Sequence, residues 1–92
     1  MQSAFVAIAS GRVQMVLYRD FCQRKARALR IAGEVENLVD GTVRVRAEGP
    51  REGLEKFAES LKRGSLLSRV DHVALEWVKP TGEFTSFIIR YT

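Results

Sequence analysis

The feature that most constrains the fold is a short stretch in which apolar and polar residues alternate strictly. It covers residues 42–48 and directly follows the turn signal Asp40-Gly41. The apolar side chains of this stretch all fall on one face: Val43, Val45 and Ala47. Because strand side chains point alternately to opposite faces, the pattern predicts one strand of a hairpin with a buried and a solvated face. A sheet built on this hairpin has one covered side.

Four further stretches are expected to complete the sheet. Residues 5–10 carry apolar side chains on both faces of the expected strand: Phe5, Ala7 and Ala9 on one, Val6 and Ile8 on the other. Burial on both faces predicts a central strand. Residues 34–37 form a short strand before the hairpin turn. Residues 70–78 and 84–91 are expected as the last two strands. Their inward-facing residues are predicted to be Val73, Leu75, Trp77, Phe87, Ile89 and Tyr91.

Two helices are predicted between these strands. Residues 20–31 carry an apolar stripe, with Asp20 and Gln23 as a capping box and Gly33 as the stop. Residues 50–63 repeat apolar side chains at helical spacing, with Pro50 in the first turn and Gly64 at the end. The predicted order is β-α-β-β-α-β-β. Two βαβ units around a hairpin predict an α+β, ferredoxin-like βαββαβ sandwich: an antiparallel sheet with two helices on one face.

Length and composition say more about domain number and cell compartment than about function. Ninety-two residues suit a single domain, residues 1–92. The lone cysteine, Cys22, excludes an internal disulfide, and one Cys with one His cannot build a zinc site. Neither a signal peptide nor an apolar run of membrane-spanning length is present, so a cytoplasmic protein is expected. The net charge of +4 permits an anionic partner without identifying one.

The loop between the first strand and the first helix is the candidate binding site. Backbone N–H groups at a helix N-terminus favour anions, and Arg19 stands where this loop becomes helix. The other reading of Arg19 is a solvated surface group. Asn37 ends the second strand, and the first βαβ unit can bring it to the same edge of the sheet. An arginine with loop amides can hold a phosphoryl group while an asparagine positions an attacking water.

Two separated motifs contain these residues. The first matches at Gly11, Val13, Gln14, Val16, Tyr18 and Arg19. The second matches at Gly33, Val35, Asn37, Gly41, Val43 and Gly49. With both motifs in this order and the same order of elements, the chain resembles the acylphosphatase family over nearly its whole length.

The resemblance implies hydrolysis of acyl phosphates to a carboxylate and inorganic phosphate, with no metal, cofactor or protein nucleophile. It implies that Arg19 binds the phosphate and that Asn37 orients the water. The implied phosphate-binding loop comprises Gln14, Met15, Val16, Leu17, Tyr18 and Arg19. The expected partners are a small-molecule acyl phosphate, and inorganic phosphate or sulfate as a ligand. Neither nucleic acid nor a membrane is expected, and the chain is expected as a monomer or weak dimer.

The sequence also departs from the family pattern. Met15 and Leu17 replace two loop glycines, and a residue with a Cβ is disfavoured at positive φ by roughly 1–2 kcal/mol. Glu34 replaces an aromatic residue. Glu36, beside Asn37, either repels an anionic substrate or is simply solvated. Two readings stay open: an active acylphosphatase, or an acylphosphatase-like domain with little or no activity that binds an anion or a partner.

Other candidates have simpler readings. His72 is expected to face solvent, and Trp77 is expected in the core. Cys22 is either a small core residue or a low-pKa thiolate near Arg19. Asp20 either caps the helix or orients Arg19. An RNA-binding module of the same fold class needs aromatic residues on the central strands, and residues 42–48 contain none.

Overall fold

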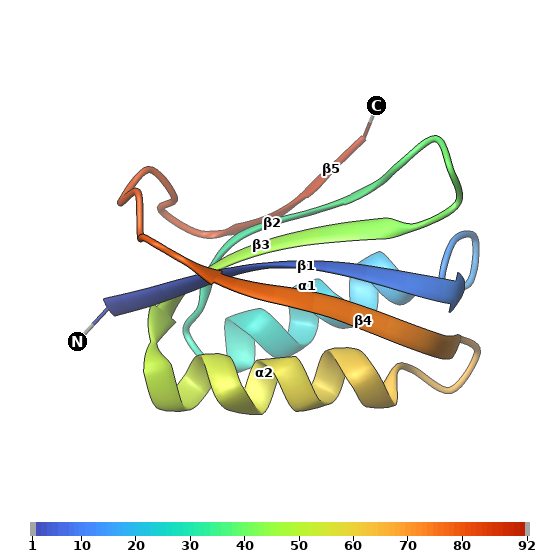
Figure 1. Ribbon diagram of the computed structural model, residues 1–92, viewed down its shortest axis with the longest axis horizontal. Helices are drawn as coiled ribbons and strands as arrows, with labels where there is room; N and C mark the ends of the chain where they lie inside the picture. The colour runs from blue at the N-terminus through green and yellow to red at the C-terminus, as the bar shows by residue number, and fades with distance from the viewer. Residues whose placement is uncertain (1, 92) are drawn as a thin grey trace.

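The computed structural model describes residues 2–91, in which a five-stranded sheet is covered on one face by two helices (Figure 1). In chain order the elements are β1 (Gln2–Arg12), α1 (Tyr18–Ala28), β2 (Ala32–Asn37), β3 (Val43–Pro50), α2 (Arg51–Arg63), β4 (Arg69–Val78) and β5 (Phe87–Arg90). The ferredoxin-like α+β fold predicted from the sequence is confirmed. Neither of the two helices in the described chain is long and apolar enough to cross a bilayer.

The strand order in the sheet is β4-β1-β3-β2-β5. Neighbouring strands are antiparallel except β2 and β5, which are parallel. The expectation of a purely antiparallel sheet is therefore wrong at this edge. The chain leaves β4 at one edge, reverses direction and returns along the opposite edge, where β2 runs the same way (Figure 1). The central position predicted for the first strand is correct, although Val6 and Ile8 on its open face are only half-buried.

The core lies between the sheet and the helices. Three phenylalanines form its centre: the Phe57 ring lies 6.1 Å from that of Phe5 and 5.6 Å from that of Phe87. Burial of aromatic and aliphatic side chains here supplies the main driving force for folding. Trp77, predicted in the core, is instead 37% exposed at its margin, because β4 is an edge strand. Its ring packs edge-on against Phe5 and beneath the guanidinium of Arg51, 3.6 Å from the ring centroid.

Helix α1 begins and ends earlier than the sequence predicts. Its N-cap residue is Leu17 in the left-handed conformation, and no side chain caps it. Asp20 lies inside the first turn, 2.9 Å from Arg24, so the predicted capping box is wrong. At the other end, Arg30 takes a positive φ of 58° directly after the last turn. The predicted stop, Gly33, lies within β2.

Gly33 is required there by close packing rather than by a helix end. A Cβ at this position would lie 1.9 Å from the carbonyl oxygen of Arg46 on β3. Helix α2 agrees better with its prediction, since it ends at Gly64, whose φ is 75°. Pro50 precedes its first turn in an extended conformation, and not within that turn as predicted. The predicted fifth strand is shorter in the structure, Phe87–Arg90. Phe84 precedes it, and its ring centre lies 4.9 Å from the Cζ of Arg46.

Candidate active site

The loop joining β1 to α1 has an unusual backbone. Met15 and Leu17 both have a φ of 63°, whereas Val16 between them does not have a positive φ. Alternation of right- and left-handed residues turns successive N–H groups toward one point and makes an anion-binding concavity. The two residues that replace glycines thus keep the left-handed backbone that glycine adopts freely, at a cost of roughly 1–2 kcal/mol each. Their side chains extend into solvent, with Met15 98% and Leu17 67% exposed.

The first turn of α1 adds further donors to this loop. The Phe21 N–H donates to the Leu17 carbonyl at 3.0 Å, which is the first bond of the helix. The N–H groups of the three residues before Phe21 therefore have no acceptor within the helix. They lie at the positive end of the helix dipole, where a negative charge is stabilised. The loop and helix start together can hold a small oxyanion.

Gln14 joins this loop to the β2–β3 hairpin. Its Nε2 donates to the carbonyl oxygens of Leu38 and Thr42, each at 2.8 Å. Leu38 directly follows Asn37, the last residue of β2. The side chain of Gln14, predicted as a member of the binding loop, thus holds that loop against the end of the strand that carries Asn37.

Arg19 is the second residue of α1 and is half-buried. Its Nη1 donates to the Arg90 carbonyl oxygen at 3.3 Å, and its Cζ lies 4.9 Å from the centre of the Tyr91 ring. None of the ion pairs within residues 2–91 includes Arg19. The end of β5 therefore orients the guanidinium while most of its five N–H donors stay available. The sequence predicts Tyr91 on an inward strand face, and no local pattern links it to Arg19, so this contact is not foreseen from the sequence.

Asn37 has an unusual polar atom at the end of β2. Its Oδ1 is buried and has no hydrogen-bond partner in residues 2–91. A buried acceptor without a partner costs about 1–3 kcal/mol, so such atoms in proteins usually bond to water or a ligand. The asparagine therefore presents a vacant acceptor next to the segment that Gln14 binds.

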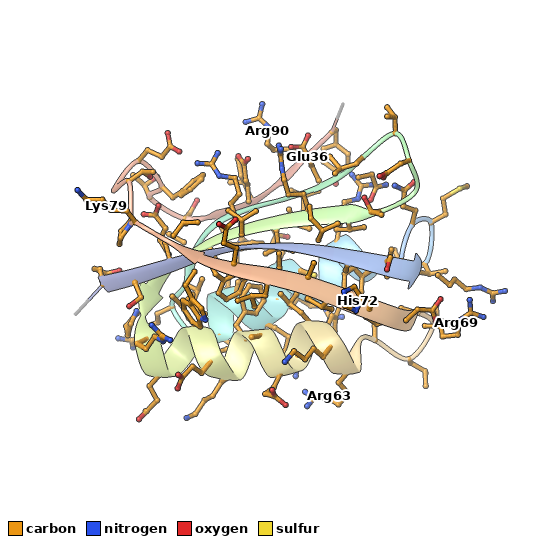
Figure 2. All side chains as sticks on the ribbon, viewed as in Figure 1. Glu36, Arg63, Arg69, His72, Lys79 and Arg90 are labelled. Atoms are coloured by element: carbon orange, nitrogen blue, oxygen red, sulfur yellow. The ribbon has the colours of Figure 1, made fainter. Side chains whose placement is uncertain are left out.

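Glu34 and Glu36 lie on the face of the sheet opposite the helices. The prediction that Glu36 is solvated is wrong: both carboxylates are buried. Glu36 pairs with Arg44, and Glu34 lies 3.5 Å from Arg46 and 3.4 Å from Arg90. Glu36 and Arg90 are neighbours in the sheet register of β2 and β5 (Figure 2). Because adjacent strand residues point to opposite faces, the Glu36 carboxylate is directed away from the side that Asn37 faces.

The side chains of the remaining candidate residues take no part in the loop and strand end described above. His72 is exposed on β4, as predicted (Figure 2). Cys22 is fully buried, and burial raises the pKa of its thiol to about 12, so the low-pKa reading is wrong. Burial also raises the pKa of Tyr18, whose hydroxyl donates to the Leu61 carbonyl at 2.8 Å. Asp20 pairs with Arg24 and does not orient Arg19.

Comparison with known proteins identifies the family. The acylphosphatase family model matches residues 5–89. An acylphosphatase of Thermus thermophilus is 51% identical over 77 residues, which are 84% of this chain and 88% of that protein. The crystal structure of acylphosphatase from Bacillus subtilis superposes with a TM-score of 0.93 at 36% identity, covering 99% of this chain and all of that one. A Coxiella burnetii acylphosphatase structure, at 29% identity and 97% and 93% coverage, gives a TM-score of 0.90. This chain belongs to the acylphosphatase family, a family of hydrolases that act on acyl phosphates.

Proposed function

We propose that residues 1–92 act as one acylphosphatase domain in which Arg19 and the backbone amides of Met15–Tyr18 bind the phosphoryl group and Asn37 positions the attacking water. The observation that carries the proposal is the buried Asn37 Oδ1 without a partner. Gln14 holds this strand end against a loop that exposes N–H donors. An anion site and a vacant acceptor on adjoining segments suit a hydrolytic reaction.

The binding half of the site follows from charge. The loop amides and the helix N-terminus supply donors that are fixed before the substrate arrives. The Arg19 guanidinium adds a permanent positive charge and forked donors that match phosphoryl oxygens. Because charge on these oxygens is redistributed during transfer, donors placed in advance stabilise the transition state without reorganisation.

The chemical half needs one oriented water. Asn37 Oδ1 accepts a hydrogen bond from that water, which directs an oxygen lone pair toward phosphorus. A P–O bond to water then forms while the P–O bond to the acyl oxygen breaks. The carboxylate departs with the bonding electrons, and both protons of the water end on the phosphate, so an acyl phosphate dianion yields a carboxylate and dihydrogen phosphate. The phosphoryl oxygens take the proton that leaves the water, so no side-chain base is required.

The side chains of Met15 and Leu17 support an active enzyme over an inactive binding module. Both side chains are largely exposed to solvent. The loop keeps the left-handed backbone at both positions despite the Cβ atoms. Both observations support a cradle that the departures from glycine leave open. We further propose a small-molecule substrate, phosphate or sulfate as a competing ligand, a cytoplasmic setting and a monomer or weak dimer with no nucleic-acid partner.

The test is hydrolysis of benzoyl phosphate by the wild type, Arg19→Ala and Asn37→Ala. Loss of a preorganised group of this kind lowers kcat/KM by about 100- to 1,000-fold. Arg24→Ala is the matched control, since Arg24 lies on the same helix and pairs only with Asp20 at the surface. We expect the control to keep the wild-type rate. Equal rates for the wild type and both site variants would refute the assignment.

A further inference from the structure

Three large apolar side chains stand exposed around the mouth of the phosphate loop. Met15 and Val39 are almost entirely solvent-exposed, and Leu17 is two-thirds exposed. We call Met15, Leu17 and Val39 the apolar rim. Single exposed apolar residues are ordinary, but a cluster beside a binding site indicates a contact surface for a ligand.

A hydrogen bond joins the two backbone segments that carry Met15 and Val39. Gln14 donates to the Leu38 carbonyl at 2.8 Å, and Met15 and Val39 are the residues that directly follow these two. The rim therefore combines the phosphate loop with the tip of the β2–β3 hairpin. The α2–β4 loop lies at the same end of the molecule and adds Leu66 and Leu67 (Figure 1). Five of the nine exposed large apolar side chains in residues 2–91 thus lie on the loops at this end, which argues against a random scatter.

From this arrangement we infer that the apolar rim binds the hydrocarbon part of the substrate, so that the preferred substrates are acyl phosphates with medium-length alkyl or aryl groups. The inference rests on the proposed function of the same site. With the phosphoryl group against the loop amides, the acyl group would extend from the open side of the loop. Met15, Leu17 and Val39 are the exposed apolar side chains on this loop and on the adjoining hairpin tip.

The backbone at positions 15 and 17 supports this role. Both residues hold a φ of 63°, where asparagine or glycine is accommodated more easily than methionine or leucine. Their side chains make no contribution to the core, because they are exposed. An apolar side chain at a strained and exposed position is therefore explained by contact with a ligand better than by stability.

The experiment compares acetyl, butyryl, hexanoyl and benzoyl phosphate, with carbamoyl phosphate as the polar member of the series. Partial burial of the added methylenes against the rim is expected to raise kcat/KM about tenfold from acetyl to hexanoyl phosphate. In Met15→Asn and Leu17→Asn, kcat/KM for hexanoyl phosphate is expected to be no more than about threefold higher than kcat/KM for acetyl phosphate. Asparagine tolerates the left-handed backbone, so these variants remove apolar surface without demanding a new loop.

Two further variants separate contact from folding. Val39→Ser is expected to lower the ratio of the hexanoyl to the acetyl kcat/KM, as the other rim variants do. Ile88→Asn removes an exposed apolar residue of β5 and is expected to leave the preference unchanged. Methylphosphonate and hexylphosphonate bind without reacting. Hexylphosphonate is expected to have the lower inhibition constant, just as hexanoyl phosphate is expected to have the higher kcat/KM.

The outcomes are distinct. A flat series in the wild type, or an unchanged preference in all three rim variants, would overturn the inference while leaving acyl phosphate hydrolysis intact. A rim that serves a protein partner instead would give that flat series. A wild type that hydrolyses none of the acyl phosphates would overturn the proposed function and this inference with it.

Discussion

The side-chain nitrogen of Gln14 lies 2.8 Å from the carbonyl oxygen of Leu38. A second bond of the same length joins this nitrogen to Thr42. The Leu38 N–H donates to the Thr42 carbonyl at 2.9 Å. Because Leu38 follows β2 and Thr42 precedes β3, the Gln14 side chain ties the loop after β1 to both ends of the hairpin turn. In the proposed mechanism, phosphate binding and water positioning depend on Arg19 and Asn37, which are 18 residues apart in sequence. The Gln14 side chain bonds the loop before Arg19 to the residue that follows Asn37.

Replacing Gln14 by alanine removes both bonds and releases the loop from the hairpin. We expect the free energy of unfolding to fall by about 1–3 kcal/mol. We also expect kcat/KM to fall about tenfold, since small displacements of positioned groups reduce rates strongly. Urea unfolding and benzoyl phosphate hydrolysis measure the two effects. Gln23→Ala is the control: its side chain bonds to Phe87 instead, so stability should fall without a comparable loss of rate.

Glycine at position 15 or 17 should stabilise the protein. Removing the Cβ at a φ of 63° relieves a backbone strain of roughly 1–2 kcal/mol. Glycine also loses more conformational entropy on folding, which offsets about 0.5–1 kcal/mol of this gain in stability. The expected net gain for Met15→Gly or Leu17→Gly is about 0.5–1 kcal/mol in urea unfolding. Val16→Gly lies in the same loop without a positive φ and should destabilise. A loss of stability in all three variants would contradict a strained loop.

Glu48 should make the stability depend on pH. Burial opposes its ionisation, but donors from Thr81 and Gly82 and the charge of Arg46 outweigh burial and lower the pKa. Because the folded pKa lies below the unfolded value of about 4.3, this stabilisation is present above that pH and is lost as the pH falls through the folded pKa. Between about pH 6 and about pH 3, Glu48→Gln should therefore lose less unfolding free energy than the wild type. Glu76→Gln, at an exposed site on β4, should follow the wild type; parallel curves for Glu48→Gln would refute the role of this carboxylate.

Cys22 should be chemically inert in the folded protein. Its thiol is buried beside Tyr18, and burial raises the thiol pKa to about 12, so little thiolate forms near neutral pH. We expect a disulfide reagent to modify it only after urea unfolds the chain. A Leu66→Cys change in a Cys22→Ala background gives the exposed control and should react at once. Rapid labelling of the native wild type would show that the helix opens locally.

Much of the fold could be predicted because it depends on periodicity. The alternation in residues 42–48 corresponds to β3, and the helical stripe that includes Phe57 and Leu61 corresponds to α2. The start of α1 could not be predicted, because a left-handed Leu17 begins the helix where Asp20 offered the more familiar cap. The role of Gly33 could not be predicted for a related reason. Its backbone role is set by Arg46, a residue of another strand that local pattern does not reveal.

The candidate site residues are predicted from the two motifs, whereas the contacts that hold them in place are tertiary. The contact of Arg19 with Arg90 and Tyr91 joins residues 71 or more positions apart, a separation that no local spacing rule covers. The burial of Glu34 and Glu36 follows from cross-strand pairing with Arg46 and Arg44 in the register of β2 and β3. That register, once the hairpin turn was identified, contained enough information to predict these pairs.

The most direct test of the central claim separates binding from chemistry in one set of measurements. Inorganic phosphate is used as a competitive inhibitor of benzoyl phosphate hydrolysis in the wild type, Arg19→Ala and Asn37→Ala. If Arg19 holds the phosphoryl group and Asn37 steers the water, Arg19→Ala raises the phosphate inhibition constant at least about tenfold. Asn37→Ala leaves that constant within about threefold of the wild type and lowers kcat about 100-fold. An unchanged phosphate inhibition constant in Arg19→Ala, or an unchanged kcat in Asn37→Ala, would contradict the account.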